Sequence, residues 1–540
     1  MASVGVAGIA VVGGLVGTGA IGAAGSPLTP GTITPVAAAN TKATGFARSD
    51  VLSRELEETP VAKGSDAIEN PTSAHPYYGY DGDGPEVPAP GDVPADGHIV
   101  EATKTEPDKN TYLILGGQRG PDPHYDYGTH FLFQGHEGSG EITRVNLDAD
   151  AAHRVTLLAS TDASGAPLPL IDGSTWDPWA RRLLFTSEEG TDGGVWQSTL
   201  DGHVQDVSGV FGRASYEGVQ NDSDGNVWLV EDTGGSTGAV NDHAKQPNSF
   251  IYRFEPREVH DLTKGGKLQV LQVRSLAHRG QPIAFHAGQA DADILSQDVR
   301  DLHTYGKTFA TRWVTIHDTA TDGDEPFDAN GLAKAARGTP FKRPENAQFR
   351  PGTQFREFYF DETGDTDARS QANSGYGGYG SIMALSQSSP SSDRGVLRPF
   401  YEADQEHSSF DNVTFLSSNH VALVQDAGDT LHTQANALDS AFVFDVTRSY
   451  GAPHAPPPVR MLAQGRDASA TLDSRLGAFP GFNNAGDNEI TGIHASDGDP
   501  GTAGILGASV PRIFSDPGWR LFYTGQHGDN VTYEITPKLG

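Results

Sequence analysis

Pairs of acidic residues recur along this sequence at a nearly constant spacing. In each pair the first acid precedes a short β-rich run and the second lies in a later loop. The stretch REFYFDETGD, Arg356 to Asp365, shows the end of one such unit, with the second acid at Asp361. The pairs are Asp172 and Glu188, Glu217 and Asp232, Glu345 and Asp361, and Asp411 and Asp426, which are 16, 15, 16 and 15 positions apart. Scattered surface charge rarely has this regularity, so we expect repeating units that each present acids to a shared site.

Carboxylates that converge within a few ångströms repel one another, and they become protonated or move apart unless cations lie between them. The spacing therefore indicates bound metal, and the candidate ligands are Glu188, Glu217, Asp232, Glu345, Asp411, Asp426, Glu489 and His527. Their donors are carboxylate oxygens and one imidazole, and the chain has no cysteine. Such a set suits hard cations, namely calcium, magnesium, manganese or ferric iron. The alternative for each single acid is a cap on its own hairpin turn.

Six segments share one arrangement, in which a turn, a short β-rich run, an acidic or His-bearing loop and a second β-rich run follow one another. They start at Gly128, Ser174, Glu217, Glu345, Asp411 and Glu489. Six units of three or four short strands predict a mainly β fold, a six-bladed β-propeller, in which the start of each innermost strand faces a central channel. A β-sandwich with extra hairpins is the alternative. The 66 glycines and 34 prolines agree with many short strands joined by turns.

The chain of 540 residues divides into three parts. Residues 1–40 are an apolar segment similar to an export signal, and residues 41–110 are rich in Pro, Gly and acids and are expected to form an extended leader. Residues 111–540 hold the predicted propeller. Within them the stretch at about 257–342 breaks the repeat and contains a helix-like run from Asp328 to Arg337. We therefore expect a partly helical insertion over one face of the propeller.

The apolar stretch from Ala2 to Gly25 carries no charge and is followed by the small residues Ala37, Ala38 and Ala39. This pattern is typical of an export signal. A retained membrane anchor is the alternative, but many glycines make a poor spanning helix. We therefore expect an exported protein, secreted, periplasmic or associated with the cell envelope, without a stable membrane span in the mature chain.

Acidic residues outnumber Lys and Arg by 70 to 38, which gives a formal net charge of −32. Such a surface repels nucleic acid and anionic lipid, so no nucleic-acid partner is expected, and metal cations are the more natural partners. The same charge favours a soluble monomer.

Several patches from about Ile171 to the C-terminus resemble the PhoX-type alkaline phosphatases of bacteria. The closest patches are STWDPWARRLLFTSEE and LAKAARGTPFKRPENAQFRP, the second of which contains Arg343 in its RPE motif. Further patches are YEGV with VWLVEDTG, FDNVTFL with HVALVQDAG, and NEITG with LFYTGQHGDN. The patches share the order and spacing of that family.

This resemblance implies an exported six-bladed propeller with a helical insertion that uses ferric iron and calcium to hydrolyse phosphate monoesters. It implies metal ligation by Glu217, Asp232, Glu345, Asp411 and Glu489, with Glu188 and Glu189 in the same neighbourhood. Arg343 is expected to face the phosphate. The sequence departs from the family in having Ser187 at the position of an iron-binding cysteine and Tyr216 at the position of a histidine. Calcium is therefore the expected cation, and the iron that the family uses lacks its thiolate ligand here.

The resulting hypothesis is an exported, metal-dependent phosphatase that hydrolyses phosphate monoesters at a carboxylate-rich metal site in the propeller channel. One alternative is a catalytically silent, calcium-stabilised propeller that acts as an extracytoplasmic binding module. Another is a lactonase-like propeller or a phosphohydrolase that uses calcium alone, which needs an open calcium position.

Overall fold

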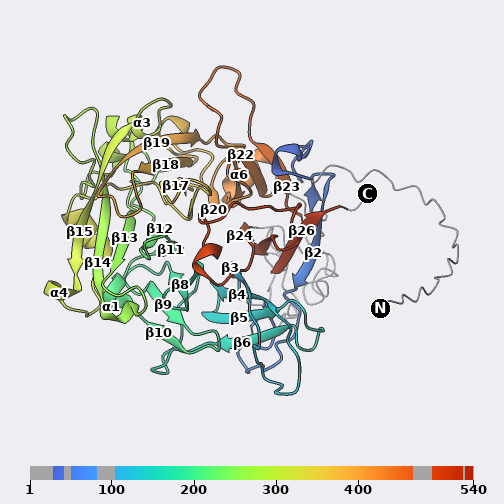
Figure 1. The fold of residues 1–540 in the computed structure, drawn as a ribbon. Coiled ribbons are helices and arrows are strands. Elements are labelled where there is room, and N and C mark those ends of the chain that lie inside the picture. The colour runs from blue at the N-terminus through green and yellow to red at the C-terminus, as the bar shows by residue number, and fades with distance from the viewer. Residues whose placement is uncertain (1–27, 42–49, 82–103, 466–488, 527–529, 539–540) are drawn as a thin grey trace, which may run out of the picture.

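The computed structural model describes residues 28–41, 50–81, 104–465, 489–526 and 530–538. The described chain is mainly β and forms five antiparallel sheets that lie side by side around a common centre (Figure 1). The predicted export segment, residues 2–25, lies outside the described residues. In the part of the chain that the structure describes, no helix is long and apolar enough to cross a membrane.

Three of the sheets have four strands and one has five. The first comprises β3 (Pro107–Ile114), β4 (His130–His136), β5 (Glu141–Asn146) and β6 (Val155–Ala159). The second comprises β7 (Ser174–Asp177), β8 (Arg182–Ser187), β9 (Gly194–Ser198) and β10 (Val204–Asp206). The five-stranded sheet runs β20 (Phe410–Phe415), β21 (His420–Gln425), β22 (Ser440–Asp445), β23 (Val459–Ala463) and β1 (Val51–Leu52). The last runs β24 (Glu489–Ser496), β25 (Arg520–Gln526), β26 (Val531–Pro537) and β2 (Leu56–Ala62).

The remaining sheet has nine strands, because one long strand joins two runs of four. The first run is β11 (Tyr216–Asn221), β12 (Val227–Glu231), β13 (Ile251–Pro256) and β14 (Gly266–Val273). The second is β16 (Ala347–Phe349), β17 (Glu357–Glu362), β18 (Ser381–Gln387) and β19 (Arg394–Glu402). The joining strand β15 (Phe309–Asp318) pairs with β14 on one side and with β19 on the other.

The helices are short and lie outside the sheets. They are α1 (Ser208–Phe211), α2 (Ala290–Ile294), α3 (Gln297–Leu302), α4 (Thr319–Asp322), α5 (Ala329–Ala335) and α6 (Gly428–Ala435), with 3-10 turns η1 (Pro30–Thr32), η2 (Leu262–Lys264), η3 (Ser374–Tyr376) and η4 (Thr502–Gly504). The predicted helix at 328–337 is confirmed as α5, where the Asp328 carboxylate accepts a hydrogen bond from the Gly331 N–H at 2.8 Å and caps the helix start.

Six strands form a ring at the centre of the molecule. Each of β3, β7, β11, β16, β20 and β24 contacts the next, and β24 contacts β3. The mainly β prediction and the propeller-like arrangement are therefore confirmed. The prediction of six blades is met only in part, because β15 merges two of the six strand groups into one sheet.

Hydrophobic cores fill the spaces between neighbouring sheets. In β8, Leu183 and Phe185 pack in the core shared with the first sheet, whereas Leu184 between them packs in the core on the other side. All three side chains are fully buried. Since successive strand residues point to opposite faces, a strand covered on both faces needs a continuous apolar run, and LLF supplies it.

The expected extended leader at 41–110 is wrong in part. β1 pairs with β23, and β2 pairs with β26, so the N-terminal region completes two sheets that the C-terminal half of the chain begins. Tyr78 and Tyr80 are also fully buried. The expected insertion at 257–342 contains α2 to α5 and β15, but it also includes β14, the fourth strand of its group. The region rich in Pro and acids shows no strand pattern, because β1 and β2 are buried only through pairing with distant strands.

Because β2 ties the N-terminal region to the last strands of the chain, loss of its core contact should destabilise the whole ring. Leu56 is 3% exposed and packs in the core between the last two sheets. We expect Leu56→Ala to lower the free energy of unfolding by about 2–5 kcal/mol. Urea denaturation measures this loss, with the exposed neighbour Glu57→Ala as the control. Equal stability of the two variants would contradict a closing role for β2.

Candidate metal centre in the central channel

The inner strands of the ring bring acids together at the central channel. Asp108 lies at the start of β3, Glu217 at the start of β11 and Asp411 at the start of β20. Asp172 and Glu345 lie two residues before β7 and β16. Each of these five residues is at most 5% exposed. The repeated position of the acid relative to an inner strand is what makes the five side chains converge.

A second set of acids comes from the turns that follow the second strand in four of the six strand groups, whereas Asp361, the partner of Glu345 in the sequence, lies within β17. Glu137 follows β4, Glu188 follows β8, Asp232 follows β12, and Asp426 follows β21. These turns return to the channel next to the inner-strand acids. The spacing of 15 or 16 positions is therefore the length of one inner strand, its hairpin and the second strand.

Three groups of these acids could each hold a cation, because one carboxylate oxygen from each member lies within 4.8 Å of the others. The groups are Asp108, Glu137 and Asp172; Asp172, Glu188 and Glu217; and Glu217, Asp232 and Glu345. Asp172 belongs to the first two groups and Glu217 to the last two. The seven carboxylates thus form one continuous row, which we call the acidic row.

Burial and mutual repulsion make it costly to ionise these acids without a counter-charge. Burial first, and then the neighbouring carboxylates, raise the pKa of Asp172, Glu188 and Glu217 well above the usual range. Burial also raises the pKa of Glu345, against the charge of Arg343. A cation placed among these oxygens would remove the cause of the shifts.

Asp108 and Asp411 are both almost fully buried. Burial raises the pKa of both groups to about 7; the charge of Asp411 adds to the shift at Asp108, and that of Asp426 adds to the shift at Asp411. Asp108 accepts hydrogen bonds from the Thr491 hydroxyl at 2.7 Å and the Gln526 amide at 3.0 Å. Fixed donors from β24 and β25 therefore hold this carboxylate in place.

Several oxygens of the channel acids have no hydrogen-bond partner among the described residues although they are buried. They are Asp172 Oδ1, Asp361 Oδ2 and Asp411 Oδ2. A buried carboxylate oxygen without a donor loses its hydration without compensation. The unsatisfied oxygens and the all-oxygen donor set both fit a hard divalent cation such as calcium.

Arg343 lies at the edge of the acidic row. Its Nε and Nη2 donate to the two oxygens of Asp232 at 3.0 and 2.6 Å, and Nη2 is 3.3 Å from Glu345 Oε1. Its φ of 56° is in the left-handed region, which is rare for a non-glycine residue and is further disfavoured before Pro344. Backbone bonds from Thr363 and Gly364 to the Arg343 and Lys342 carbonyls hold this conformation. The surrounding structure thus fixes Arg343 against the row.

The sequence-predicted residues fall into three classes. The structure brings together Glu188, Glu217, Asp232 and Glu345 in the acidic row, with Arg343 against it. Asp411 and Asp426 lie close enough to the row to act on its charges. Glu489 is the first residue of β24 but is not a member of the three acid groups, and His527 lies outside the described residues.

Sequence reasoning missed Asp108, Glu137, Lys109 and Lys245. Asp108 and Glu137 occupy the same positions as the other pairs, but 29 residues separate them because the loop between β3 and β4 is long. Lys109 is 2% exposed, and its ammonium donates to the carbonyl of Ile493 at 3.2 Å and to the side chain of Asn346 at 3.5 Å. Asp108 could have been predicted from its position at the start of a β-rich run, which it shares with Glu217 and Asp411.

Two positions where the sequence departs from the PhoX pattern lie near the row. Ser187 ends β8 next to Glu188, is fully buried, and its hydroxyl has no hydrogen-bond partner among the described residues. Tyr216 points into the core instead, where its hydroxyl donates to the Phe211 carbonyl at 2.8 Å. A neutral serine hydroxyl is a poor ligand for ferric iron, so the residues present do not fit the iron that the resemblance implied.

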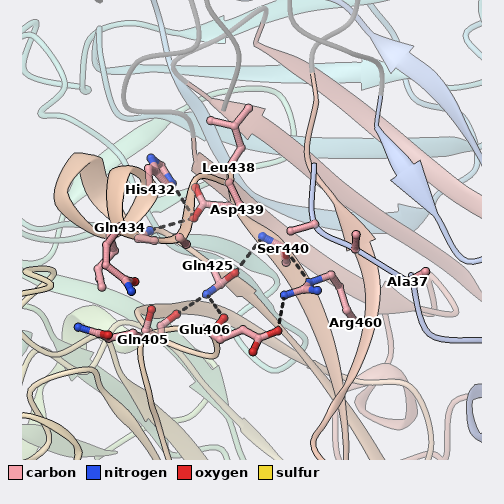
Figure 2. Close-up of a pocket in the computed structure, with 17 residues that line it drawn as sticks. Ala37, Gln405, Glu406, Gln425, His432, Gln434, Leu438, Asp439, Ser440 and Arg460 are labelled. Carbon is pink, nitrogen blue, oxygen red and sulfur yellow. Dashed lines mark hydrogen bonds and ion pairs between the residues drawn. The ribbon is translucent and has the colours of Figure 1, made fainter. Parts of the chain in front are cut away.

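A separate cavity of about 490 Å³ lies between α6 and the segment Ala37 to Ala39. Figure 2 shows His432 directed at Asp439, with 3.0 Å between Nε2 and Oδ1. None of the residues that line this cavity belongs to the acidic row. The cavity therefore does not extend the candidate metal centre.

Comparisons with known proteins show the fold but not the family. No family model and no curated protein matches the chain. Among solved structures, PhoX of Pseudomonas fluorescens in complex with vanadate, a transition state analogue, aligns with a TM-score of 0.51 at 10% identity, covering 93% of this chain and 98% of that one. An inactive virginiamycin B lyase of Staphylococcus aureus aligns with a TM-score of 0.33 at 9% identity, covering 80% and 96%. A luciferin-regenerating enzyme aligns with a TM-score of 0.36 at 8% identity, covering 81% and 92%.

The raised pKa values predict how the stability of the cation-free protein depends on pH. The folded-state pKa values of Asp108 and Asp411, about 7, exceed the ordinary value of 3.8, so the folded state holds more protons than the unfolded state between about pH 4 and pH 7. Stability is therefore lost as the pH rises through this window. With a chelator present, we expect the Tm at pH 8 to be about 5–10 °C below that at pH 5.

Circular dichroism melts with chelator and with excess calcium measure this difference. Calcium should raise the Tm at pH 8 and have little effect at pH 5, where the carboxylates hold protons. Asp108→Asn should reduce the pH dependence without calcium, while Asp324→Asn, at an exposed bend, should leave it unchanged. If the Tm of the cation-free protein rose between pH 5 and pH 7, the raised pKa values of Asp108 and Asp411 could not be the cause of its pH dependence.

Proposed function

We propose that the central channel is the active site of a metal-dependent phosphatase that hydrolyses phosphate monoesters. The observation that carries the proposal is the continuous acidic row with Arg343 fixed against it. The fold likeness to PhoX with bound vanadate supports it, because vanadate mimics the transferred phosphoryl group in that protein. The patches around Ser174 and Arg343 resemble the same family.

The proposal includes finer statements about architecture, cation and location. We infer a six-bladed propeller in which β11 to β14 and β16 to β19 are two blades joined by β15, because the inner strands close a ring of six. We infer calcium as the cation, since the donors are oxygens. We also infer export, from the uncharged apolar stretch at residues 2–25.

In the mechanism, the acidic row holds cations and Arg343 orients the phosphoryl group. Bound cations supply positive charge that polarises the phosphoryl oxygens and activates a nucleophile. Arg343 uses Nε and Nη2 for Asp232, whereas its Nη1 makes no hydrogen bond to a described residue. The side chain is 18% exposed, so Nη1 is available to a phosphoryl oxygen. Asp232 fixes the plane of the guanidinium and therefore the direction of that donor.

The first test is hydrolysis of p-nitrophenyl phosphate at alkaline pH, with calcium present and then chelated. We expect turnover that the chelator removes and calcium restores. Glu345→Gln should lose at least about 100-fold in kcat and should also bind fewer calcium ions by equilibrium dialysis. The matched control is Glu258→Gln, because Glu258 is exposed and does not belong to the acidic row. Full activity in Glu345→Gln would overturn the proposal.

A second candidate function is favoured by the residue at position 187. The buried Ser187 hydroxyl supplies no negative charge where the PhoX pattern has a thiolate. A protein that has lost one ligand and with it the reaction would remain a calcium-stabilised binding module. Folded, calcium-loaded protein without turnover would support this module in place of the phosphatase.

A further inference from the structure

Lys245 is a cation beside the acidic row that the sequence patterns do not single out. It lies in the loop between β12 and β13, where it forms a β-bridge with Thr237. The Lys245 N–H donates to Asp365 Oδ1 at 2.9 Å, which fixes its backbone. Its Cδ lies 4.0 Å from the position that a β-carbon would take at Gly234, two residues after Asp232. The stem of the side chain therefore runs along the turn that delivers Asp232 to the row.

The other cations of this region are all bound to partners. Lys342 forms a buried ion pair with Asp365 at 2.8 Å, Arg343 pairs with Asp232, and Lys109 donates to Asn346 and Ile493. The ammonium of Lys245, by contrast, makes no hydrogen bond or ion pair with any residue that the structure describes. A half-buried ammonium without a partner has lost hydration and gained little in return.

The Lys245 ammonium lies within electrostatic reach of Arg343 and of two acids of the row, as expected for a side chain that runs along the turn after Asp232. Burial, followed by the positive charge of Arg343, lowers the pKa of Lys245, while Asp232, Asp365 and Glu345 act in the opposite direction. Two cations that act on each other create a region of positive potential that favours an anion. An anion bound there would satisfy both.

We propose that Lys245 is a second phosphate-binding residue, which pairs with an unesterified oxygen of the phosphoryl group and so selects monoesters over diesters. The inference rests on the proposed phosphatase function and adds its substrate class. A monoester dianion offers an extra charged oxygen that a diester has replaced with an organic group. Arg343 holds the phosphoryl group through Nη1, and the Lys245 ammonium pairs with the charged oxygen that only the monoester has.

A buried network sets the relative position of the two cations. Asp365 accepts from the Lys245 backbone and from the Lys342 ammonium, and Lys342 directly precedes Arg343. Glu362 accepts from the Lys342 N–H at 2.7 Å and pairs with the buried His303 at 3.0 Å. Asp365 and Glu362 are each at most 3% exposed. The structure thus ties Lys245 and Arg343 to one rigid frame, as a two-armed anion site requires.

The test compares Lys245→Met, Lys245→Arg and the control Lys264→Met, whose ammonium is exposed and pairs with Asp261 at the surface. Calcium-loaded proteins are assayed with p-nitrophenyl phosphate and with the diester bis(p-nitrophenyl) phosphate. Binding of inorganic phosphate is measured by titration calorimetry, and circular dichroism melts check folding. Loss of one charge-assisted hydrogen bond predicts that Lys245→Met loses about 10- to 100-fold in monoester kcat/KM and in phosphate affinity.

The same variant should lose at most about 3-fold on the diester, because the missing contact serves the third unesterified oxygen, which a diester lacks. Lys245→Arg should recover most of the monoester activity, and Lys264→Met should match the wild type. Equal losses on monoester and diester, or unchanged phosphate binding in Lys245→Met, would overturn the inference while the phosphatase stands. Phosphate binding that depends on Lys245 without turnover would support the binding site and refute the phosphatase. Wild-type protein that neither binds phosphate nor turns over would refute both.

Discussion

The repulsion among buried carboxylates in the channel is the constraint on which the rest of the structure depends. Two charges 4.8 Å apart, the limit within each acid group, repel by about 3 kcal/mol at an effective dielectric constant near 20. Seven acids in one row multiply that cost. Side chains on mobile loops would relieve it by moving apart. The inner strands prevent this, because hydrophobic cores clamp each sheet on both faces.

The protein offsets only part of this negative charge with its own residues. Lys109 is buried beside Asp108 and Asp411, while the partly exposed Arg343 and Lys245 act on Asp232 and Glu345. Three cations face the seven acids of the row, with Asp411 and Asp426 in addition. Without further cations the balance is met by protons, as the raised pKa values of the acids indicate. If the row binds cations, as proposed, binding replaces these protons, and the exchange couples cation binding to stability.

Features that depend on residues close together in the sequence could be predicted, whereas features that depend on pairing between distant segments could not. Glu217 and Asp232 were found because a short hairpin separates them, so the spacing repeats from unit to unit. Asp108 and Glu137 have the same structural positions but were missed, since a long loop between β3 and β4 breaks the spacing. β2, with the sequence LEETPVA, shows no strand signal of its own and is a strand because β26 offers it a free edge. The merging of two strand groups by β15 likewise depends on pairing between distant segments. Lys245 belongs to a loop without any periodic pattern.

Ser187 offers a hydroxyl where the PhoX pattern that the sequence resembles has a thiolate, so the charge of the site comes from its carboxylates. A buried serine contributes no negative charge and no soft donor, so every strong ligand in the row is a carboxylate oxygen. In the proposed phosphatase such a row would hold calcium, which polarises a phosphoryl group less than ferric iron because its charge is lower and its ligand distances are longer. Positive charge from the protein then matters more at the substrate. Arg343 Nη1 and the Lys245 ammonium, neither of which bonds to a described residue, would supply that charge beside Asp232 and Glu345.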